Sequence, residues 1–320
     1  MRMKIVGTGI YAPPRVETAA DLARKIGRSE DWIIKNTGVV RRHISEEPVE
    51  EMAAKAARSA LGKGPQPDLI LNASTTPCQL IPDSSVFIQK ALNFDGIASY
   101  SIHATCLSFL VALHMAGIFV DRGVNRRILV VSSEMSSTSR DLNEPESSAL
   151  LGDGAAAAVI EPTPEKEDSE LLAWSMGTWP KGAHFAQLKG AGVRHHPNDP
   201  ATVPEDNLFR MDGPALYKMA RPRAALVLGK ALKQARLKPE DLDLVIPHQA
   251  SKAMLESAPF YGVRLDQVVN ILAEYGNCIA ASLPMALAVA NQKGMIHRGS
   301  HIMLVGMGAG LSIAAAILRW

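Results

Sequence analysis

Three side chains in this sequence could together carry nucleophilic chemistry: Cys106, His248 and Asn277. Cys106 follows a short polar segment and precedes a long apolar run, as expected for a residue at the start of a buried helix. The partial positive charge at a helix N-terminus favours a thiolate, so we expect a lowered pKa and a nucleophilic sulfur. Taken alone, a cysteine is more often a small buried hydrophobe, and Cys106 therefore needs catalytic partners.

Two polar residues in the second half of the chain are candidate partners. His248 follows the apolar run Leu244–Pro247, at the carboxyl end of a predicted strand, where α/β sheets usually place catalytic groups. Asn277 follows a glycine and opens another apolar run, although asparagine is also a common helix N-cap. The glycine-rich segment Gly306–Gly310 also follows a predicted strand. We expect a loop there that either presents backbone N–H groups to an oxyanion or makes a tight turn.

These residues need strands and helices to position them, and the hydrophobic pattern predicts an α/β layered protein. Short apolar runs predict buried strands at residues 69–71, 128–131, 155–160, 244–246 and 302–305. Longer runs between them predict helices at residues 49–61, 107–121, 214–235 and 281–292. The segment Gly7-Thr8-Gly9 lacks the third glycine of a dinucleotide-binding fingerprint, and we expect it to form a turn.

A faint internal repeat indicates that the fold is duplicated. Asp68 matches Asp243 at an offset of 175, Cys106 matches Asn277 at 171, and residues 128–131 match 302–305 at 174. The charged, proline-containing connection near residue 165 predicts two halves, residues 1–165 with the nucleophile and residues 166–320 with the histidine and asparagine. Residues 175–212 break the repeat and are expected to cover a site or a partner contact.

Composition narrows the class of protein. The chain has 320 residues, of which 47% are hydrophobic and 21% charged, as in an ordinary globular protein. A formal charge of +2 argues against general attraction to nucleic acid or to a membrane surface. The longest apolar run, residues 107–120, is too short to span a bilayer. The cysteines, Cys78, Cys106 and Cys278, are too few for a disulfide framework or a metal site, which favours a reducing cytoplasm.

The cysteine, histidine and asparagine, in this order and with these flanks, resemble the thiolase superfamily, specifically its β-ketoacyl-acyl carrier protein synthase III branch. The similarity covers nearly the whole chain, in the motifs Lys4–Pro13, Glu30–Ile44, the Cys106 segment, Leu151–Ala156, Pro247–Ala250, Gly276–Ser282 and Gly306–Gly310. The resemblance implies a duplicated five-layer αβαβα fold, a homodimer and a catalytic triad of Cys106, His248 and Asn277. It also accounts for the repeat.

The resemblance further implies a reaction. Cys106 attacks an acyl thioester, usually of coenzyme A, and becomes acylated, while backbone amides of Cys106 and of the Gly308 and Ala309 turn stabilise the oxyanion. His248 and Asn277 then donate hydrogen bonds to a malonyl thioester, which loses carbon dioxide and attacks the acyl group. Coenzyme A or phosphopantetheine thioesters are substrates in this scheme, and no metal or redox cofactor is required.

Binding residues follow from the same resemblance. It implies substrate-binding roles for Trp32, Ile81, Lys218 and Ser251, with Ile81 reaching the site of the neighbouring subunit. The chain departs from the family by lacking three arginines that hold coenzyme A or a carrier protein, at Asn36, Pro145 and Ala253. A basic patch is the predicted docking surface for an acidic acyl carrier protein: Arg221, Arg223 and Lys252. A solvated helix face is the alternative interpretation.

Four alternatives stay open at this level. The acyl-cysteine could pass its acyl group to an alcohol or amine, or two acyl thioesters could condense without decarboxylation. A papain-like cysteine hydrolase also uses Cys, His and Asn, although the duplicated halves argue against it. A non-catalytic scaffold subunit would be expected to have lost part of the triad, which is intact here.

Overall fold

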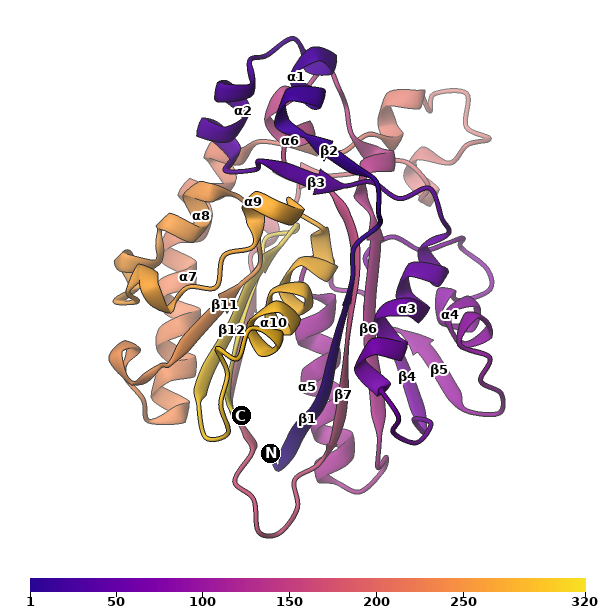
Figure 1. Ribbon diagram of the computed structural model, residues 1–320. Coiled ribbons are helices and arrows are strands. Elements are labelled where there is room, and N and C mark those ends of the chain that lie inside the picture. Colours follow the sequence, from indigo (N-terminus) through magenta and orange to yellow (C-terminus); the bar gives the residue numbers. More distant parts are fainter.

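The computed structural model describes residues 1–320, in which two β-sheets enclose a layer of helices (Figure 1). The first sheet has the strand order β1–β7–β6–β4–β5. Its strands are β1 Met3–Tyr11, β4 Leu69–Asn72, β5 Ala98–Ser101, β6 Ile128–Met135 and β7 Asp153–Pro162. The second sheet has the order β11–β12–β13–β8. Its strands are β8 Glu170–Thr178, β11 Leu244–Pro247, β12 His301–Gly308 and β13 Ser312–Arg319.

Helices fill three layers around these sheets. Helices α5 (Ser108–Asp121) and α10 (Ser282–Gln292) lie between the sheets, where most of their side chains are buried. Helices α3 (Val49–Leu61) and α4 (Ser84–Leu92) cover the outer face of the first sheet, and α7 (Gly213–Ala235) covers the second (Figure 1). Because α5 and α10 meet apolar side chains on nearly every side, their sequences are apolar all round. The predicted five-layer αβαβα architecture is confirmed.

The two sheets repeat one topology. In the first sheet, β1 pairs antiparallel with β7, β7 antiparallel with β6, and β6 parallel with β4. In the second, β8, β13, β12 and β11 repeat these pairings in the same order. A parallel bridge between Val245 and Val268 occupies the place that β5 has in the first sheet. The duplication that the sequence repeat indicated is therefore present in the strand connections.

The two halves share their inner layer. The first sheet takes its strands from residues 3–162 and the second from residues 170–319. However, α10 packs on β1 and β7, and α5 packs on β12 and β13, so each sheet is covered by a helix from the other half. The division into residues 1–165 and 166–320 therefore stays a prediction about independent units.

The predicted strands and helices are confirmed, with end points within a few residues, but both glycine predictions need correction. Gly7 and Gly9 lie inside β1 rather than in a turn. A Cβ atom on Gly9 would overlap the carbonyl oxygen of Ala56, so this glycine lets α3 pack directly on the strand. Gly306 and Gly308 belong to β12, and only the residues from Ala309 to Leu311 turn the chain into β13.

A small cap of shorter elements sits above one end of the sheets (Figure 1). It contains β2 Val16–Thr18, α1 Ala19–Ile26, α2 Glu30–Thr37 and β3 Arg41–His43. The remaining short helices are α6 Pro145–Ser148, α8 Lys252–Glu256 and α9 Leu272–Tyr275, and β9 Ala186–Gln187 pairs with β10 Arg210–Met211. No helix of the chain is long and apolar enough to cross a membrane, and the 14-residue apolar run belongs to the buried α5.

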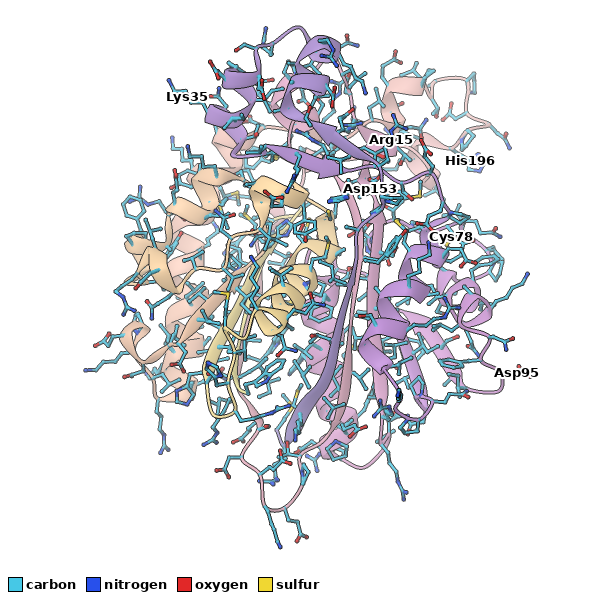
Figure 2. All side chains as sticks on the ribbon, in the orientation of Figure 1. Arg15, Lys35, Cys78, Asp95, Asp153 and His196 are labelled. Atoms are coloured by element: carbon cyan, nitrogen blue, oxygen red, sulfur yellow. The ribbon has the colours of Figure 1, made fainter.

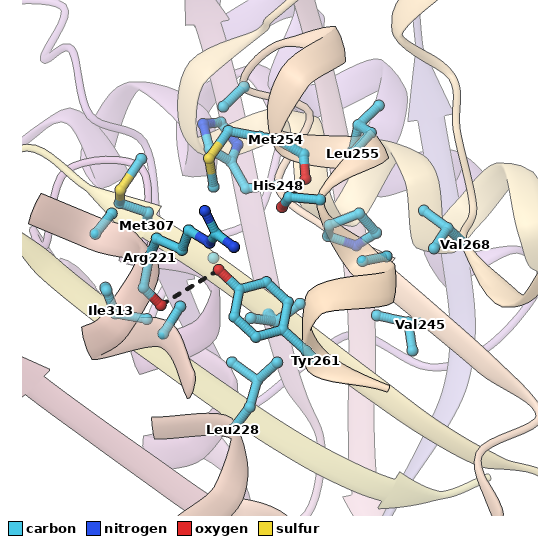
Figure 3. Close-up of a pocket in the computed structure, with 18 of the residues that line it drawn as sticks. Arg221, Leu228, Val245, His248, Met254, Leu255, Tyr261, Val268, Met307 and Ile313 are labelled. Carbon is cyan, nitrogen blue, oxygen red and sulfur yellow. Dashed lines mark hydrogen bonds between the residues drawn. The ribbon is translucent and has the colours of Figure 1, made fainter. Parts of the chain in front are cut away.

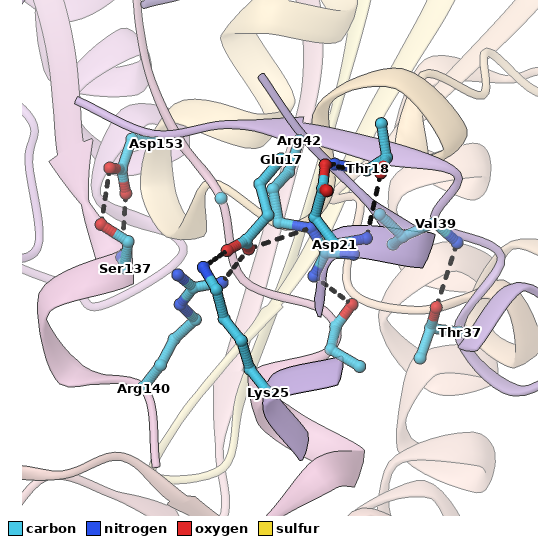
Figure 4. Close-up of polar contacts among 12 residues, drawn as sticks. Glu17, Thr18, Asp21, Lys25, Thr37, Val39, Arg42, Ser137, Arg140 and Asp153 are labelled. Atoms are coloured by element: carbon cyan, nitrogen blue, oxygen red, sulfur yellow. Dashed lines mark hydrogen bonds and ion pairs between the residues drawn. The ribbon is translucent and has the colours of Figure 1, made fainter. Parts of the chain in front are cut away.

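Buried charged side chains connect the cap to the rest of the protein (Figure 4). The carboxylate of Glu17 on β2, only 4% exposed, pairs with Lys25 at 2.6 Å and with Arg140 at 2.5 Å. Its neighbour Arg42 is fully buried and donates from Nη1 to the carbonyl oxygen of Ala149 at 2.7 Å. Hydrogen bonds and ion pairs to these two groups offset the cost of burying their charges.

We expect Gly9→Ala to lower the free energy of unfolding by about 2 kcal/mol or more, because the added methyl group pushes α3 away from β1. The matched control is Gly229→Ala, at an open position inside α7, which should stabilise the protein by about 0.5–1 kcal/mol. Chemical denaturation of both variants measures the difference. Equal effects at the two positions would contradict the close packing at Gly9.

Candidate active site

Cys106, His248 and Asn277 line one cavity of about 390 Å³, together with Ala309 and Ser251. The triad residues come from three separate connections: the approach to α5, the end of β11, and the segment between α9 and α10. Most of the other lining side chains are apolar, so the polar groups converge in a largely dry space. The sequence predicted these three residues, and the structure brings them together.

The backbone before α5 positions Cys106. Thr105 has a φ of 51°, in the left-handed region that β-branched residues rarely adopt. The Ser108 hydroxyl accepts the N–H of Ala104 at 2.9 Å and donates to the carbonyl of Thr105 at 2.7 Å, which holds this tight turn. Gly308 packs against the same turn, where a Cβ atom would overlap the Thr105 hydroxyl. The cysteine is therefore held by a strained turn, a feature that is common at active sites.

Burial, and not the helix N-terminus, dominates the electrostatics of Cys106. Desolvation, with a smaller contribution from the nearby Glu134 carboxyl, raises the pKa of its thiol to about 12, although N–H groups of Cys106 and Ala309 act in the opposite direction. The prediction of a lowered pKa is thus wrong for the unliganded protein. Helix α5 begins at Ser108, so the sulfur lies before its first turn. A thiol in this state needs a proton acceptor before it can attack a thioester.

His248 can fill that role because it is neutral. Burial lowers the pKa of this imidazole to about 4, and its Nδ1 is enclosed without a hydrogen-bond partner. Its backbone N–H continues the β11–β12 pairing by donating to Val305 at 2.8 Å. Gln249, the next residue, donates from its side chain to Pro247 and Val269 and accepts from Ile271, which fixes the turn.

Asn277 is held on both its main chain and its side chain. Its backbone N–H donates to Leu150 at 2.7 Å, and its carbonyl accepts from Gly152 at 3.1 Å. Its Oδ1 accepts from the N–H of Ile279 at 2.9 Å, and its Nδ2 lies 3.4 Å from the carbonyl of Ala250. An amide carries two N–H donors on one nitrogen, so one remains for a ligand.

The repeat seen in the structure does not match Cys106 with Asn277, as the repeat in the sequence did. The turn before α10 copies the turn before α5: Ile279 has a φ of 46°, and Ser282 accepts the N–H of Cys278 at 2.7 Å. Ile279 and Ser282 match Thr105 and Ser108 at an offset of 174, the offset of the β6 and β12 strands. At that offset Asn277 matches His103, not Cys106. The triad is therefore asymmetric within a symmetric scaffold.

The cap supports the asparagine indirectly. Arg42 binds the carbonyl of Ala149, and the next carbonyl, of Leu150, accepts the N–H of Asn277. Gly152 and Gly276 both lie close to the Cβ of Arg42, so this buried arginine packs against the junction that carries Asn277. Desolvation lowers the pKa of the Arg42 guanidinium to about 10, and it remains charged at neutral pH.

The two residues predicted to stabilise the oxyanion, Gly308 and Ala309, have different surroundings in the structure. The N–H groups that reach the Cys106 sulfur are those of Cys106 itself and of Ala309. No hydrogen bond joins Gly308 to that sulfur, and Gly308 lies at the end of β12, where its missing side chain admits Thr105. The Ala309 N–H approaches the sulfur and Gly308 packs against Thr105, and an oxyanion role for either residue stays a prediction.

Of the predicted substrate-binding residues, only Ser251 lines the cavity. Trp32 lies on α2 with the Arg28 guanidinium 5.4 Å from its ring centre, outside the lining residues. Lys218 is an exposed residue on α7, whose neighbour Tyr217 lines the cavity. Ile81 is 84% exposed and does not line the cavity of its own chain. Roles for these three residues stay predictions.

The predicted carrier patch is divided by the structure. Arg221 is exposed and its guanidinium lies 3.6 Å from the centre of the Phe260 ring. Arg223 is half-buried, donates to the carbonyl of Met219 at 2.6 Å, and stacks over Trp179. Arg221 and Arg223 thus point in different directions, as residues two apart on a helix do, and their role in a carrier patch stays a prediction. Lys252 is half-buried near Glu256, at 3.9 Å.

Glu134 is a buried residue near the site that sequence reasoning missed. It follows Ser132 and Ser133 near the end of β6, is 0% exposed, and accepts N–H groups of Thr75 at 2.5 Å and Thr76 at 3.3 Å. Desolvation raises the pKa of its carboxyl to about 7. The signal available in the sequence was a single acidic residue near the end of an otherwise uncharged strand.

The segment that interrupts the repeat also contributes to the cavity. Ala186, Phe209 and Met211 line it, which confirms that residues 175–212 cover a site. All three cysteines have free thiols. Cys78 is exposed on the loop before α4 (Figure 2), and Cys278 is buried next to Asn277 in the sequence. Of the three, only Cys106 lines the cavity that also contains His248 and Asn277.

A duplicated five-layer fold with a cysteine, a histidine and an asparagine in one inner cavity defines the thiolase-like class of condensing enzymes. Family models for 3-oxoacyl-[acyl-carrier-protein] synthase III match residues 100–180, and those for its C-terminal part match residues 232–320. The chain belongs to the β-ketoacyl-acyl carrier protein synthase III family and is an acyltransferase. This fold excludes the papain-like alternative.

Individual relatives are similar along their whole length. The β-ketoacyl-[acyl-carrier-protein] synthase III of Aquifex aeolicus is 33% identical, with 100% of both chains covered. The crystal structure of 3-oxoacyl-(acyl carrier protein) synthase III from Pseudomonas aeruginosa superimposes with a TM-score of 0.91 at 28% identity, covering 100% of this chain and 98% of the other. The priming β-ketosynthase of the R1128 polyketide pathway has the same TM-score and identity, covering 99% and 96%.

The burial of neutral His248 predicts a pH dependence of stability. Its pKa is about 4 in the folded chain and about 6.5 when unfolded, so the unfolded state binds a proton first as the pH falls. The free energy of unfolding should fall by about 3 kcal/mol between pH 6.5 and pH 4 from this group alone. Denaturation across this range should show a shallower fall for His248→Gln. The control His297→Gln, at an exposed histidine, should follow the unmodified protein.

Proposed function

We propose that this protein takes an acyl group from a thioester onto Cys106 and condenses it with a malonyl thioester, with loss of carbon dioxide. The observation that carries the proposal is the convergence of Cys106, His248 and Asn277 in a single apolar cavity. The names of the relatives, β-ketoacyl-acyl carrier protein synthases and a priming ketosynthase, support the same reaction.

In the first step the Cys106 thiol attacks the thioester carbonyl. Its proton passes to the neutral imidazole of His248 and then to the leaving thiolate, so the cavity gains no net charge. The N–H groups of Cys106 and Ala309 are placed to bind the oxyanion, since both already approach the sulfur. The products are acyl-Cys106 and a free thiol.

In the second step His248 and Asn277 hold the carbonyl of the malonyl thioester. A neutral imidazole has one N–H to donate, and the free N–H of the Asn277 amide supplies a second donor. Both stabilise the enolate that loss of carbon dioxide leaves, which then attacks the acyl carbon and releases the Cys106 thiolate. These side chains supply the chemistry, and we propose that no metal or redox cofactor takes part.

Several features favour a carrier protein for at least one substrate. Asn36, Pro145 and Ala253 stand where the family has arginines for coenzyme A. The side-chain amide of Asn36 donates to the carbonyl of Trp32 at 2.8 Å, Pro145 starts α6, and Ala253 lines the cavity. Lys218 and Arg221 are exposed on α7 beside the cavity and could meet an acidic carrier surface.

The three cysteines are free thiols, which fits the reducing cytoplasm that we predict for this protein.

We also propose a homodimer that joins two copies at strand β5. This strand lies at the edge of the first sheet, and the loop before α4 carries two exposed apolar residues, Leu80 at 70% and Ile81 at 84%. Pairing would cover both, and would bring Ile81 toward the partner's cavity. Sedimentation of the intact chain as a monomer at micromolar concentration would contradict this assembly.

Asn277→Ala should separate the two chemical steps. We expect it to self-acylate at a rate within a few fold of the unmodified protein, yet to lose malonyl decarboxylation and condensation by about 100-fold or more, because one enolate donor is removed. Intact-protein mass spectrometry follows acylation, and peptide mapping should place the adduct on Cys106 and on neither Cys78 nor Cys278. Loss of acylation with decarboxylation intact would contradict these roles.

Lys218→Glu should weaken a carrier-bound donor. With the same acyl group supplied on carrier protein, we expect self-acylation to slow by about threefold or more at low salt, and the difference should shrink as salt screens the charges. Lys230→Glu, the same change near the far end of α7, is the matched control. A rate on coenzyme A far above that on carrier protein, insensitive to either variant, would contradict the carrier proposal.

A further inference from the structure

A second, smaller cavity lies directly behind His248 (Figure 3). It has a volume of about 80 Å³ and lies between α7, the strands β11 and β12, and the segment from α8 to Tyr261. Ala224, Leu228, Val245 and Ile313 form its apolar inner end. The acyl-transfer mechanism described above makes no use of this space.

Five residues line both this side cavity and the catalytic cavity, and so form the partition between them: Tyr217, His248, Ala250, Met254 and Met307. Cys106 and Asn277 line the catalytic cavity only. The side cavity therefore meets the active site at the histidine that would hold the second substrate, and not at the acylated sulfur. Two flexible methionines in the partition can move aside at low cost.

Two hydroxyl groups around the side cavity are already hydrogen-bonded within the protein, whereas the Nδ1 atom of His248 is not. The Tyr261 hydroxyl donates to the carbonyl of Arg221 at 3.4 Å (Figure 3), and the Ser257 hydroxyl donates to the carbonyl of Met254 at 2.7 Å. The Arg221 guanidinium is stacked on Phe260. Since 14 of the 19 lining residues are hydrophobic, the space offers an occupant mainly apolar contact, which suits a hydrocarbon group.

We infer that the side cavity receives a short alkyl substituent on the α-carbon of the malonyl-type thioester, so that this enzyme accepts α-alkylated extender units. This inference rests on the proposed decarboxylative condensation. A cavity of about 150 Å³ can hold benzene, so a space of about 80 Å³ suits one to three carbons. A substituent of this size on the enolate carbon would extend past His248 into that space.

The reaction balances with such a substrate. The bond between the α-carbon and the carboxylate breaks, carbon dioxide leaves, and the electron pair remains on the alkylated α-carbon as the enolate. This carbon bonds to the acyl carbon of acyl-Cys106, the carbon–sulfur bond breaks, and the Cys106 thiolate takes up one proton. The product is an α-alkyl-β-keto thioester that retains one hydrogen on the α-carbon.

The experiment starts from enzyme already acylated on Cys106, with the adduct verified by intact mass. Malonyl, methylmalonyl, ethylmalonyl and butylmalonyl thioesters on one pantetheine carrier are then compared by the kcat/KM of condensation. We expect methylmalonyl and ethylmalonyl to be used within about tenfold of malonyl, and butylmalonyl to be poor because it exceeds the cavity.

Two variants test the side cavity itself. Ala224→Leu, at its inner end, should lower kcat/KM for ethylmalonyl by about tenfold or more relative to malonyl, while self-acylation is unchanged, since each methylene in an apolar pocket is worth about 10-fold or more. Ala225→Leu, on the exposed side of the same helix, is the matched control and should leave the ratio unchanged. Leu228→Ala enlarges the cavity and should improve butylmalonyl, which keeps the test informative if Ala224→Leu does not fold.

The outcomes separate this inference from the proposed function. Turnover of malonyl without any alkylated extender, or an ethylmalonyl to malonyl ratio that neither Ala224→Leu nor Leu228→Ala changes, overturns the side-cavity inference alone. Failure to decarboxylate malonyl as well, by enzyme shown to be acylated, overturns the proposed function and this inference with it.

Discussion

The burial of two helices between two sheets is the constraint on which this structure depends. Helices α5 and α10 are surrounded by apolar side chains, so the backbone N–H groups at their starts have no solvent to bind. In the turns that precede these helices, the hydroxyls of Ser108 and Ser282 accept the N–H groups of Ala104 and Cys278, and Thr105 and Ile279 adopt left-handed conformations. Polar residues and strained backbone therefore lie together in the interior of the protein, next to Cys106 and Asn277.

The same burial determines the charge state of the site. Desolvation raises the pKa of the Cys106 thiol to about 12 and lowers that of the His248 imidazole to about 4, so both groups are neutral at physiological pH. A neutral site suits a reaction in which a proton moves from one sulfur to another and charge develops only transiently on carbonyl oxygens. Fixed backbone donors at Cys106 and Ala309 act strongly there, because little water competes with them.

The scaffold is symmetric, but the substrates it would bind are not. The turns before α5 and α10 repeat at one offset, whereas Cys106 and Asn277 occupy different positions within them. His248 lies between two cavities, one that reaches the sulfur and one that does not. In our proposals this arrangement gives the acyl group and the extender separate spaces around one histidine. The identity of the extender would then depend on side chains of α7, far from the nucleophile in sequence.

The layered fold, most element positions and the three triad residues could be predicted from the sequence, because apolar periodicity and the flanks of Cys106, His248 and Asn277 are local features. The sequence did not determine the role of Gly9, which lies in a strand because α3 packs against it, or the separation of Arg221 from Arg223 by the direction of a helix face. Nor could it show the raised pKa of Cys106, the buried Glu134 or the cavity behind His248. These properties depend on distances between segments far apart in the chain, and only tertiary packing, through desolvation and close contact, decides them.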